Sequence, residues 1–363
     1  MLPFHWFSRF TLLVGLVLIW WGAAVTTEDV GLAVPDWPLA FGKINPDGWF
    51  NVPALLLEHG HRWIATTIGF LVLAMYFWQF AKCKPRFIEA AGIVLIGSGY
   101  LFLIYKMQLL PAFIIVIMGT AWLVINWLGQ RWSLLRGLTT LALFAVIIQA
   151  SLGGIRVLKM SDPYGVTHGT LGQLFFCLLV LITFASSKTW REERLIFKVG
   201  VKTKARFWSL LLFLAVFCQL VIGATLRHTQ RLYLAANDIL TTKGQIFPPF
   251  DPADVFVLHL HKYWGFSVAI LVLVVAWKAR VWLAAVPRLR WIPPALMIMP
   301  VNQVVLGIYV VLTGKSFWVT NLHVLNGLGL LVLTFLVAVS VWASTSGLGL
   351  VGQTEADKPM SHR

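Results

Sequence analysis

Long apolar runs alternate with short polar segments along most of the chain. A helix of about 20 apolar residues crosses the hydrocarbon core of a bilayer, so each run of that length predicts a transmembrane helix. The third and fourth runs are separated only by Lys106, Met107 and Gln108. The pattern predicts an all-α integral membrane protein with about ten transmembrane helices, at approximately 8–25, 58–80, 88–105, 109–129, 134–152, 165–186, 207–225, 255–277, 292–312 and 319–343.

The composition excludes an ordinary water-soluble domain, because 59% of the residues are hydrophobic and only 12% are charged. The net charge of +15 could indicate nucleic-acid binding, but Lys and Arg are spread thinly between the apolar runs. We therefore expect membrane lipid and no nucleic acid around the chain. The first run resembles a signal peptide, but Trp20 and Trp21 occupy the positions where cleavage requires small residues. Cys83, Cys177 and Cys218 form no C-x-x-C pair, so we expect no disulfide and no thiolate metal site.

The polar segments alternate in charge. Since cytoplasmic loops carry the excess of Lys and Arg, this alternation places both termini in the cytoplasm. The opposite, outer side receives the Trp- and Pro-rich segment 26–57 and the long segment 226–254. Basic residues follow every second run, at Lys82, Lys84, Arg86, Arg131, Arg136, between Lys188 and Arg206, and at Lys278, Arg280, Arg288 and Arg290.

The two halves of the sequence repeat each other. The run from Glu58 to Arg62 (EHGHR) is echoed by the run from Leu258 to Lys262 (LHLHK), and each begins a helix after a long outer segment. A Gln-x-x-x-Gly pattern precedes His168 and recurs before His323. These patterns predict two pseudo-symmetric four-helix bundles, with a transmembrane hairpin inserted in the first. The expected domains are 1–190 with the hairpin at about 85–130, a basic cytoplasmic linker at 191–205, a second half at 206–345 and a flexible tail at 346–363.

Four histidines recur two by two at corresponding helix positions: His61, His168, His261 and His323. Neutral imidazole is the form that ligates iron, and helix bundles build cofactor sites from side chains on facing helices. The repeat therefore indicates two hemes, each held by two histidines. Zinc is the competing metal, but no thiolate accompanies these histidines. A single buried histidine is usually a hydrogen-bonded core residue; His59 and His259, two residues away from a proposed ligand, point elsewhere and are assigned no iron.

One difference between the halves is chemical. Glu58 lies three residues before His61 on the same helix face, whereas Leu258 takes that place before His261. A carboxylate beside only one heme can transfer a proton or stabilise a developing cation there. The alternative is a simple ion pair between Glu58 and Arg62. Arg62 and Lys262 could neutralise heme propionates or extend their charges to the membrane interface.

Six motifs are spread over the two halves: Gly31–Gly42 (GLAVPDWPLAFG), Glu58–Arg62, Leu152–Arg156 (LGGIR), Gly223–Thr229 (GATLRHT), Gly244–Pro249 (GQIFPP) and His259–Lys262. Together they resemble the motifs of the heme A synthase family. The resemblance implies an eight-helix bacterial cell-membrane enzyme that oxidises the C8 methyl of heme O to a formyl group by two hydroxylations. It implies that His61 and His168 hold heme O, that His261 and His323 hold heme b, and that Glu58 is catalytic.

Two features depart from that family. The inserted hairpin adds two spans, and the second outer segment reads Asn237-Asp238-Ile239 in place of a Pro-Asp-aromatic core, which predicts a degenerate second loop. Heme O synthase, other oxidase assembly proteins, an unidentified electron acceptor and further copies of the chain are the expected partners. The alternatives are a diheme quinol or iron reductase, a non-catalytic heme carrier for an oxidase, and a transporter.

Overall fold

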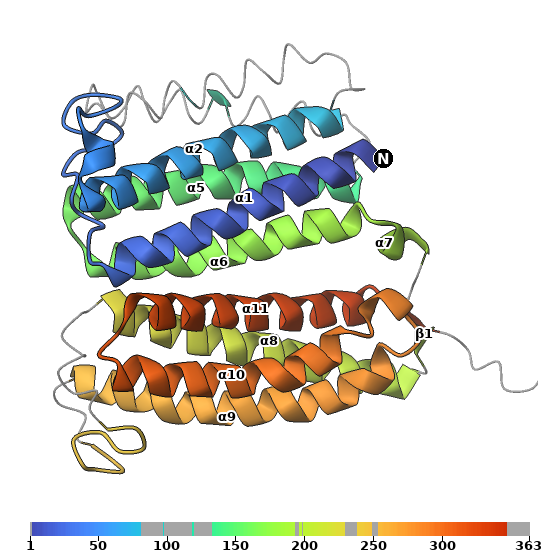
Figure 1. Ribbon diagram of the computed structural model, residues 1–363. Coiled ribbons are helices and arrows are strands. Elements are labelled where there is room, and N and C mark those ends of the chain that lie inside the picture. Colours follow the sequence, from blue (N-terminus) through green and yellow to red (C-terminus); the bar gives the residue numbers. More distant parts are fainter. Residues whose placement is uncertain are drawn as a thin grey trace, which may run out of the picture. The chain divides into compact units, whose positions relative to one another are not determined.

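The computed structural model describes residues 2–80, 133–192, 196–197, 199–228, 238–248 and 253–346, with positions 97 and 118–119. The regular secondary structure of its described part is helical apart from two strands of two residues each (Figure 1). Eight of the described helices are long and apolar enough to cross a membrane. The prediction of an all-α, multi-pass membrane protein is confirmed, whereas the inserted hairpin lies almost wholly outside the described residues.

Two compact units divide at Ser186 and Ser187. In the first, α1 (Leu2–Thr27) packs against α2 (Pro53–Phe80) and α6 (Asp162–Ala185), and α5 (Leu134–Lys159) packs against the same two helices. This is a ring of four helices, visible from blue to green in Figure 1. The loop between α1 and α2 contains a short 3-10 helix, η1 (Trp49–Asn51), and lies at one end of the ring.

The second unit repeats the ring. Its helices α8 (Val199–His228), α9 (Ala253–Trp282), α10 (Ile292–Leu312) and α11 (Phe317–Trp342) pack in sequence order, and α11 closes against α8. The short elements are α7 (Lys188–Glu192), η3 (Pro287–Leu289) and the parallel strands β1 (Ile196–Phe197) and β2 (Thr345–Ser346). Residues 199–205, which the sequence assigned to a linker, form the first turns of α8.

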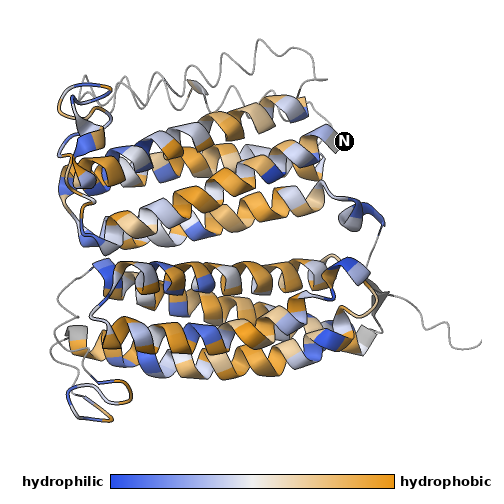
Figure 2. Ribbon diagram, in the orientation of Figure 1, coloured by the Kyte–Doolittle hydropathy of each residue, from blue (hydrophilic) through white to orange (hydrophobic). Residues whose placement is uncertain are grey.

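The helices are apolar on both their inner and outer faces. Inside the first unit, Ile68, Val72 and Tyr76 of α2 are fully buried, while Phe70 on the same helix is 69% exposed. Figure 2 shows apolar residues along most of each helix and hydrophilic ones mainly near helix ends and in loops. A helix with an apolar outer face needs lipid around it, since water would not cover such a surface without a large free-energy penalty.

Helix ends extend past the apolar runs. The second helix begins at Pro53 rather than at Glu58, and α5 continues to Lys159 rather than stopping at residue 152. Backbone amides and carbonyls near a membrane surface keep their hydrogen bonds by staying helical, so polar residues are carried on additional turns. As a result Glu58 and Arg156 both lie on helices and have fixed directions.

Candidate functional site

The four predicted ligands form two pairs. His61 of α2 and His168 of α6 have ring centres 6.5 Å apart with an interplanar angle of 83°. In the second unit His261 of α9 and His323 of α11 have ring centres 6.4 Å apart at 63°. The structure therefore brings each pair together across its bundle, on helices that are not adjacent in the sequence.

A glycine on the neighbouring helix lies against each imidazole. A Cβ at Gly22 of α1 would come within 2.9 Å of the His61 ring, and one at Gly223 of α8 within 2.9 Å of the His261 ring. Cβ atoms at Gly153 and Gly307 would come within 3.2 Å of His168 and His323. Real Cβ atoms at such distances would displace the rings, so these glycines keep space for the imidazoles.

The donor set of each pair suits a porphyrin iron. A bond from a metal ion to an imidazole nitrogen is about 2.0–2.1 Å long, so two imidazoles on opposite faces of one iron have ring centres roughly 6 Å apart. Among the described residues no group of three or more His, Cys, Asp or Glu side chains could hold a metal ion. Two protein ligands leave four coordination positions for the porphyrin, whereas zinc sites take three or four ligands from the protein. Buried ring nitrogens of His61 and His323 have no hydrogen-bond partner within the described ranges.

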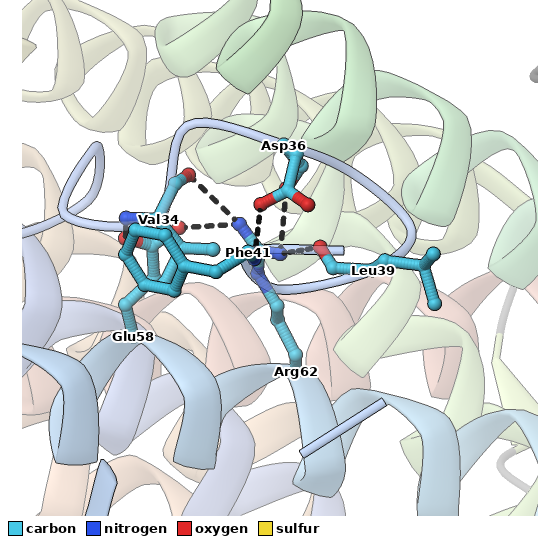
Figure 3. A network of polar contacts seen from close by, with 6 residues as sticks. All are labelled: Val34, Asp36, Leu39, Phe41, Glu58 and Arg62. Carbon is cyan, nitrogen blue, oxygen red and sulfur yellow. Dashed lines mark hydrogen bonds and ion pairs between the residues drawn. The ribbon is translucent and has the colours of Figure 1, made fainter. Parts of the chain in front are cut away.

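Glu58 is buried, with 4% of its surface exposed, and each of its two carboxylate oxygens accepts a hydrogen bond (Figure 3). Its Oε1 lies 2.6 Å from the Arg62 guanidinium, one helical turn further along α2. Its Oε2 accepts a hydrogen bond of 2.7 Å from the backbone amide of Val34, in the loop between α1 and α2. The carboxylate thus joins α2 to the loop that covers the end of the bundle.

Arg62 is the main attachment of that loop. Its guanidinium donates to the carbonyl oxygens of Asp36 at 2.8 Å, Leu39 at 3.0 Å and Val34 at 3.2 Å, in addition to the Glu58 carboxylate. Figure 3 shows the side chain rising from α2 into the ring of loop carbonyls. The ion pair between Glu58 and Arg62, which the sequence left open as the alternative role of Glu58, is present. The guanidinium also donates hydrogen bonds to carbonyl oxygens of the loop.

Asp36 closes the loop on itself. Its carboxylate accepts the amides of Phe41 at 2.7 Å and Gly42 at 2.8 Å. Burial pushes the pKa of Asp36 upward, but these amides and the nearby Arg62 charge outweigh that effect and hold the pKa below its ordinary value. Phe41 and Gly42 both have positive φ angles, 52° and 73°, which only glycine adopts without strain.

Loop 238–248 of the second unit has the same turn. Asp238 accepts the amide of Gly244 at 2.6 Å, six residues on, just as Asp36 accepts that of Gly42. Lys243 and Gly244 repeat the φ angles of 52° and 73°. Amide donors from Gly244 and the Thr241 hydroxyl lower the pKa of Asp238. The expectation of a degenerate second loop is wrong for the described part, because the Asp-to-Gly spacing, and not the aromatic residue, determines the turn.

Lys262 takes the place of Arg62 in the second unit. Its Nζ donates to the carbonyl oxygens of Asp238 and, at 3.0 Å, Thr241. Leu258 replaces Glu58 and is buried beside Val255. The two loops are therefore attached by equivalent cations, and within the described residues only the first attachment includes the side-chain carboxylate of its helix, Glu58.

His59 and His259 contact aromatic residues instead of the histidine pairs. The His59 ring is 4.7 Å from Trp49 and its Nε2 is 3.2 Å from Asn45 Oδ1. The His259 ring is 4.4 Å from Tyr263. Both assist packing beneath their loops, as their angular separation on the helix indicated.

Arg156 is a residue of the site to which the sequence assigned no role. It belongs to the LGGIR motif, at the end of α5, and a Cβ on Gly31 of the loop would come within 2.9 Å of its guanidinium. It is close enough to Glu58, His61 and His168 to interact with each electrostatically. None of the ion pairs within 4 Å in the described ranges involves it. In the second unit Arg227, from the GATLRHT motif, interacts in the same way with His323.

Comparison with known proteins gives consistent results. The model of the family described as cytochrome oxidase assembly protein matches residues 107–336. A protein of Halalkalibacterium halodurans named heme A synthase is 24% identical over 88% of this chain and 90% of its own length. Proteins with the same name from Shouchella clausii and Symbiobacterium thermophilum are each 25% identical, over 82% and 74% of this chain and 83% and 72% of their own. The family match covers more than half of the sequence, so this chain belongs to the cytochrome oxidase assembly protein family.

Proposed function

We propose that this protein is a heme A synthase, a membrane oxidoreductase that converts the C8 methyl group of heme O to a formyl group and so produces heme A for cytochrome oxidase. Its family, its relatives named heme A synthase and the eight helices of its described part that are long and apolar enough to cross a membrane support this function. The enzyme is a multi-pass protein of the bacterial cytoplasmic membrane, with both termini in the cytoplasm on the evidence of its basic segments.

The observation that carries the proposal is the difference between two otherwise equivalent sites. Both units pair two histidines at nearly the same separation and cover them with a loop held by a cation. Among the side chains that the structure describes, only the first unit has a buried carboxylate, Glu58, on a helix that carries one of the histidines. An electron carrier needs no such group, whereas oxidation of a methyl group releases protons that a carboxylate can accept.

His61 and His168 would hold the iron of the substrate heme O, and His261 and His323 would hold the iron of heme b. Heme b supplies one-electron transfer when it is bound. The glycines beside the four rings leave space for the imidazoles that would hold the two irons. Apolar side chains inside each bundle would keep water away from a bound heme.

The overall reaction consists of two hydroxylations and a dehydration. Each hydroxylation replaces one C–H bond of the methyl carbon with a C–O bond to an oxygen from water, and releases two electrons and two protons. After the second, the geminal diol loses water and leaves the aldehyde. An external electron acceptor must take up the electrons, and Glu58 would take a proton from the attacking water or stabilise a cation at the carbon.

The anionic side chains of heme need cationic partners near the histidines. Arg62 and Lys262 donate to loop carbonyls, and their role as propionate partners stays a prediction. Arg156 and Arg227 supply an alternative, since each lies near the histidines of its own unit. We assign them to the carboxylates of heme O and heme b respectively, because guanidinium groups bind carboxylates in two-pronged fashion.

Extraction of pigment from the purified protein tests the proposed function directly. A heme A synthase contains heme B together with heme O and heme A. A diheme reductase contains heme B alone, and a carrier contains heme O or heme A without converting one to the other. Finding heme B alone in cells that make heme O would contradict the proposal.

The variant Glu58→Gln tests the role of the carboxylate. The glutamine oxygen can still accept the Val34 amide, so we expect both hemes to be retained while heme A formation falls by at least a hundredfold. The matched control is Asp36→Asn, which loosens the same loop and leaves the carboxylate of Glu58 in place. Heme A at the unmodified level in Glu58→Gln would exclude a catalytic role. An equal loss in both variants would assign the effect to the loop.

A further inference from the structure

Three of the four histidines share a reciprocal arrangement with the helix beside them. One helix carries Gln-x-x-x-Gly and the helix packed against it carries His-x-x-x-Gly. The glutamine of the first helix faces the histidine of the second. The glycine of the first helix lies against that histidine, and the glycine of the second helix lies against that glutamine. The three sets are Gln149, Gly153, His168 and Gly172 on α5 and α6; Gln219, Gly223, His261 and Gly265 on α8 and α9; and Gln303, Gly307, His323 and Gly327 on α10 and α11.

The glutamines contact the imidazoles directly. Gln219 Nε2 lies 3.1 Å from His261 Nδ1 and donates to the His261 carbonyl oxygen at 3.0 Å. With its amide turned to satisfy its hydrogen bonds, Gln149 makes the same two contacts with His168, at 3.2 and 3.0 Å. Gln303 Nε2 lies 3.2 Å from Nε2 of His323, the opposite ring nitrogen to the one contacted in the other two sets, and the Gln303 oxygen accepts Asn326 Nδ2 at 2.6 Å. Nδ1 of His323 has no hydrogen-bond partner within the described residues.

In the second unit, the glycine four residues after each histidine makes room for the glutamine. A Cβ at Gly265 would be 2.9 Å from Gln219 Nε2, and one at Gly327 would be 3.3 Å from Gln303 Nε2. An amide has both a donor and an acceptor, so it can pair with an imidazole nitrogen in either tautomer by turning over. Each of these three imidazoles is therefore fixed in its rotation by a neighbour outside the ligand pair.

His61 is the exception. Gly22 lies against its ring, but Leu18 occupies the position four residues earlier on α1 where the other sets have glutamine. Ala65 replaces the glycine four residues after the histidine. The Nδ1 atom of His61, like that of His323, is buried and has no hydrogen-bond partner in the described part of the chain. His323 still has Gln303 at its Nε2, whereas no glutamine contacts the His61 ring among the described residues. The pair α1 and α2 therefore lacks the glutamine amide, at Leu18, and carries an additional methyl group, at Ala65.

We propose that Gln149, Gln219 and Gln303 are positioning residues for heme-ligating histidines, and that Leu18 leaves His61 as the one ligand able to release iron readily. Hydrogen bonds to the second nitrogen of a ligating histidine fix its orientation and typically change metal affinity by 10–100-fold. The heme of the first unit would then enter and leave as the bond between its iron and His61 forms and breaks. Both histidine ligands in the second unit would stay fixed. This inference rests on the proposed function, in which the first unit must admit a substrate and release a product.

The test introduces into α1 and α2 the glutamine and the glycine that the other three helix pairs have. The double variant is Leu18→Gln/Ala65→Gly. We measure the loss of heme from the purified, heme-loaded protein to excess apomyoglobin, which gives a fast and a slow phase. The double variant should slow the fast phase by about 10-fold or more and leave the slow phase unchanged. Gln219→Leu should accelerate only the slow phase by a similar factor.

Controls separate positioning from packing. Ala65→Gly alone adds space without an amide. Gln173→Leu removes a glutamine of α6 whose buried oxygen has no hydrogen-bond partner among the described residues. Neither variant should change either phase. The midpoint potential and the low-spin electron paramagnetic resonance signal of the slow heme should shift in Gln219→Leu, which a merely structural change would not produce. Identical rates in the double variant and the parent would overturn the proposal.

Heme loss does not depend on heme A formation. If the purified protein contains no heme A yet Leu18→Gln/Ala65→Gly slows release, the proposed function fails and the positioning role stands. If heme A forms but the rates of loss are unaffected, the positioning role fails alone.

Discussion

The indole of Trp37 lies directly against Gly154 of α5, so closely that a Cβ on Gly154 would come within 2.6 Å of it. Together with the contact between Gly31 and Arg156, this attaches loop 28–52 to α5 while Arg62 attaches it to α2. Two of the family motifs, the segment Pro35–Trp37 (PDW) and Leu152–Arg156 (LGGIR), therefore contact each other above the histidine pair.

Gly154→Ala should displace the loop. The added methyl group overlaps Trp37, so the indole must move and the hydrogen bonds of Asp36 to Phe41 and Gly42 should weaken. Hydrogen exchange of those two amides in detergent should become at least tenfold faster. Gly137→Ala, also on α5, meets nothing within 4 Å and serves as the control. Unchanged exchange in Gly154→Ala would show that the loop adapts without losing its turn.

Arg62→Ala should release the loop and leave the Glu58 charge buried without its partner. Removing one member of a buried pair costs about 3–5 kcal/mol, so we expect a clear fall in the thermal unfolding temperature. Arg62→Lys should keep most of the stability, because Lys262 holds the second loop through two carbonyls. If the alanine variant is as stable as the parent, solvent reaches Glu58 and the pair is not buried in the membrane protein.

Attachment of loop 28–52 should depend on pH through Asp36. The pKa of Asp36 is lower in the folded loop than its ordinary value of 3.8. The stabilisation is therefore present above the ordinary value and is lost as the pH falls through the folded pKa. Proteolysis of the loop should accelerate below about pH 4. Asp36→Asn should be cut more readily at neutral pH and show little further acceleration on acidification.

Arg156→Gln should weaken the hold of the first unit on heme. Loss of a charged bond to a carboxylate is worth about 1.5–3 kcal/mol, or roughly 10–150-fold in affinity. The fast-releasing heme should be depleted after gel filtration while the other stays bound. Arg227→Gln is the reciprocal variant and should affect only the heme of the second unit. Equal retention of both hemes in Arg156→Gln would contradict its assignment to the heme carboxylates.

Much of the site could be found in the sequence because helices give fixed directions to residues at known spacings. Glu58 and His61 share a face by spacing alone, and the repeat of His168 at His323 identified the second helix of each pair. The three Gln-x-x-x-Gly patterns were visible as well, but their meaning was not, since the contact of each glutamine is with a histidine on another helix. The glycines that follow the histidines on the partner helices complete that signal.

The sequence by itself determined that this protein lies in a membrane, where its helices run and which histidines are equivalent, because hydrophobic length and helical period are local properties. Only the tertiary structure decided what Arg62 and Arg156 do. The carbonyls that occupy Arg62 belong to a loop more than twenty residues away, and Gly31 lies 125 positions before Arg156. A cation binds whatever acceptors the fold brings within reach, and no local pattern encodes that choice.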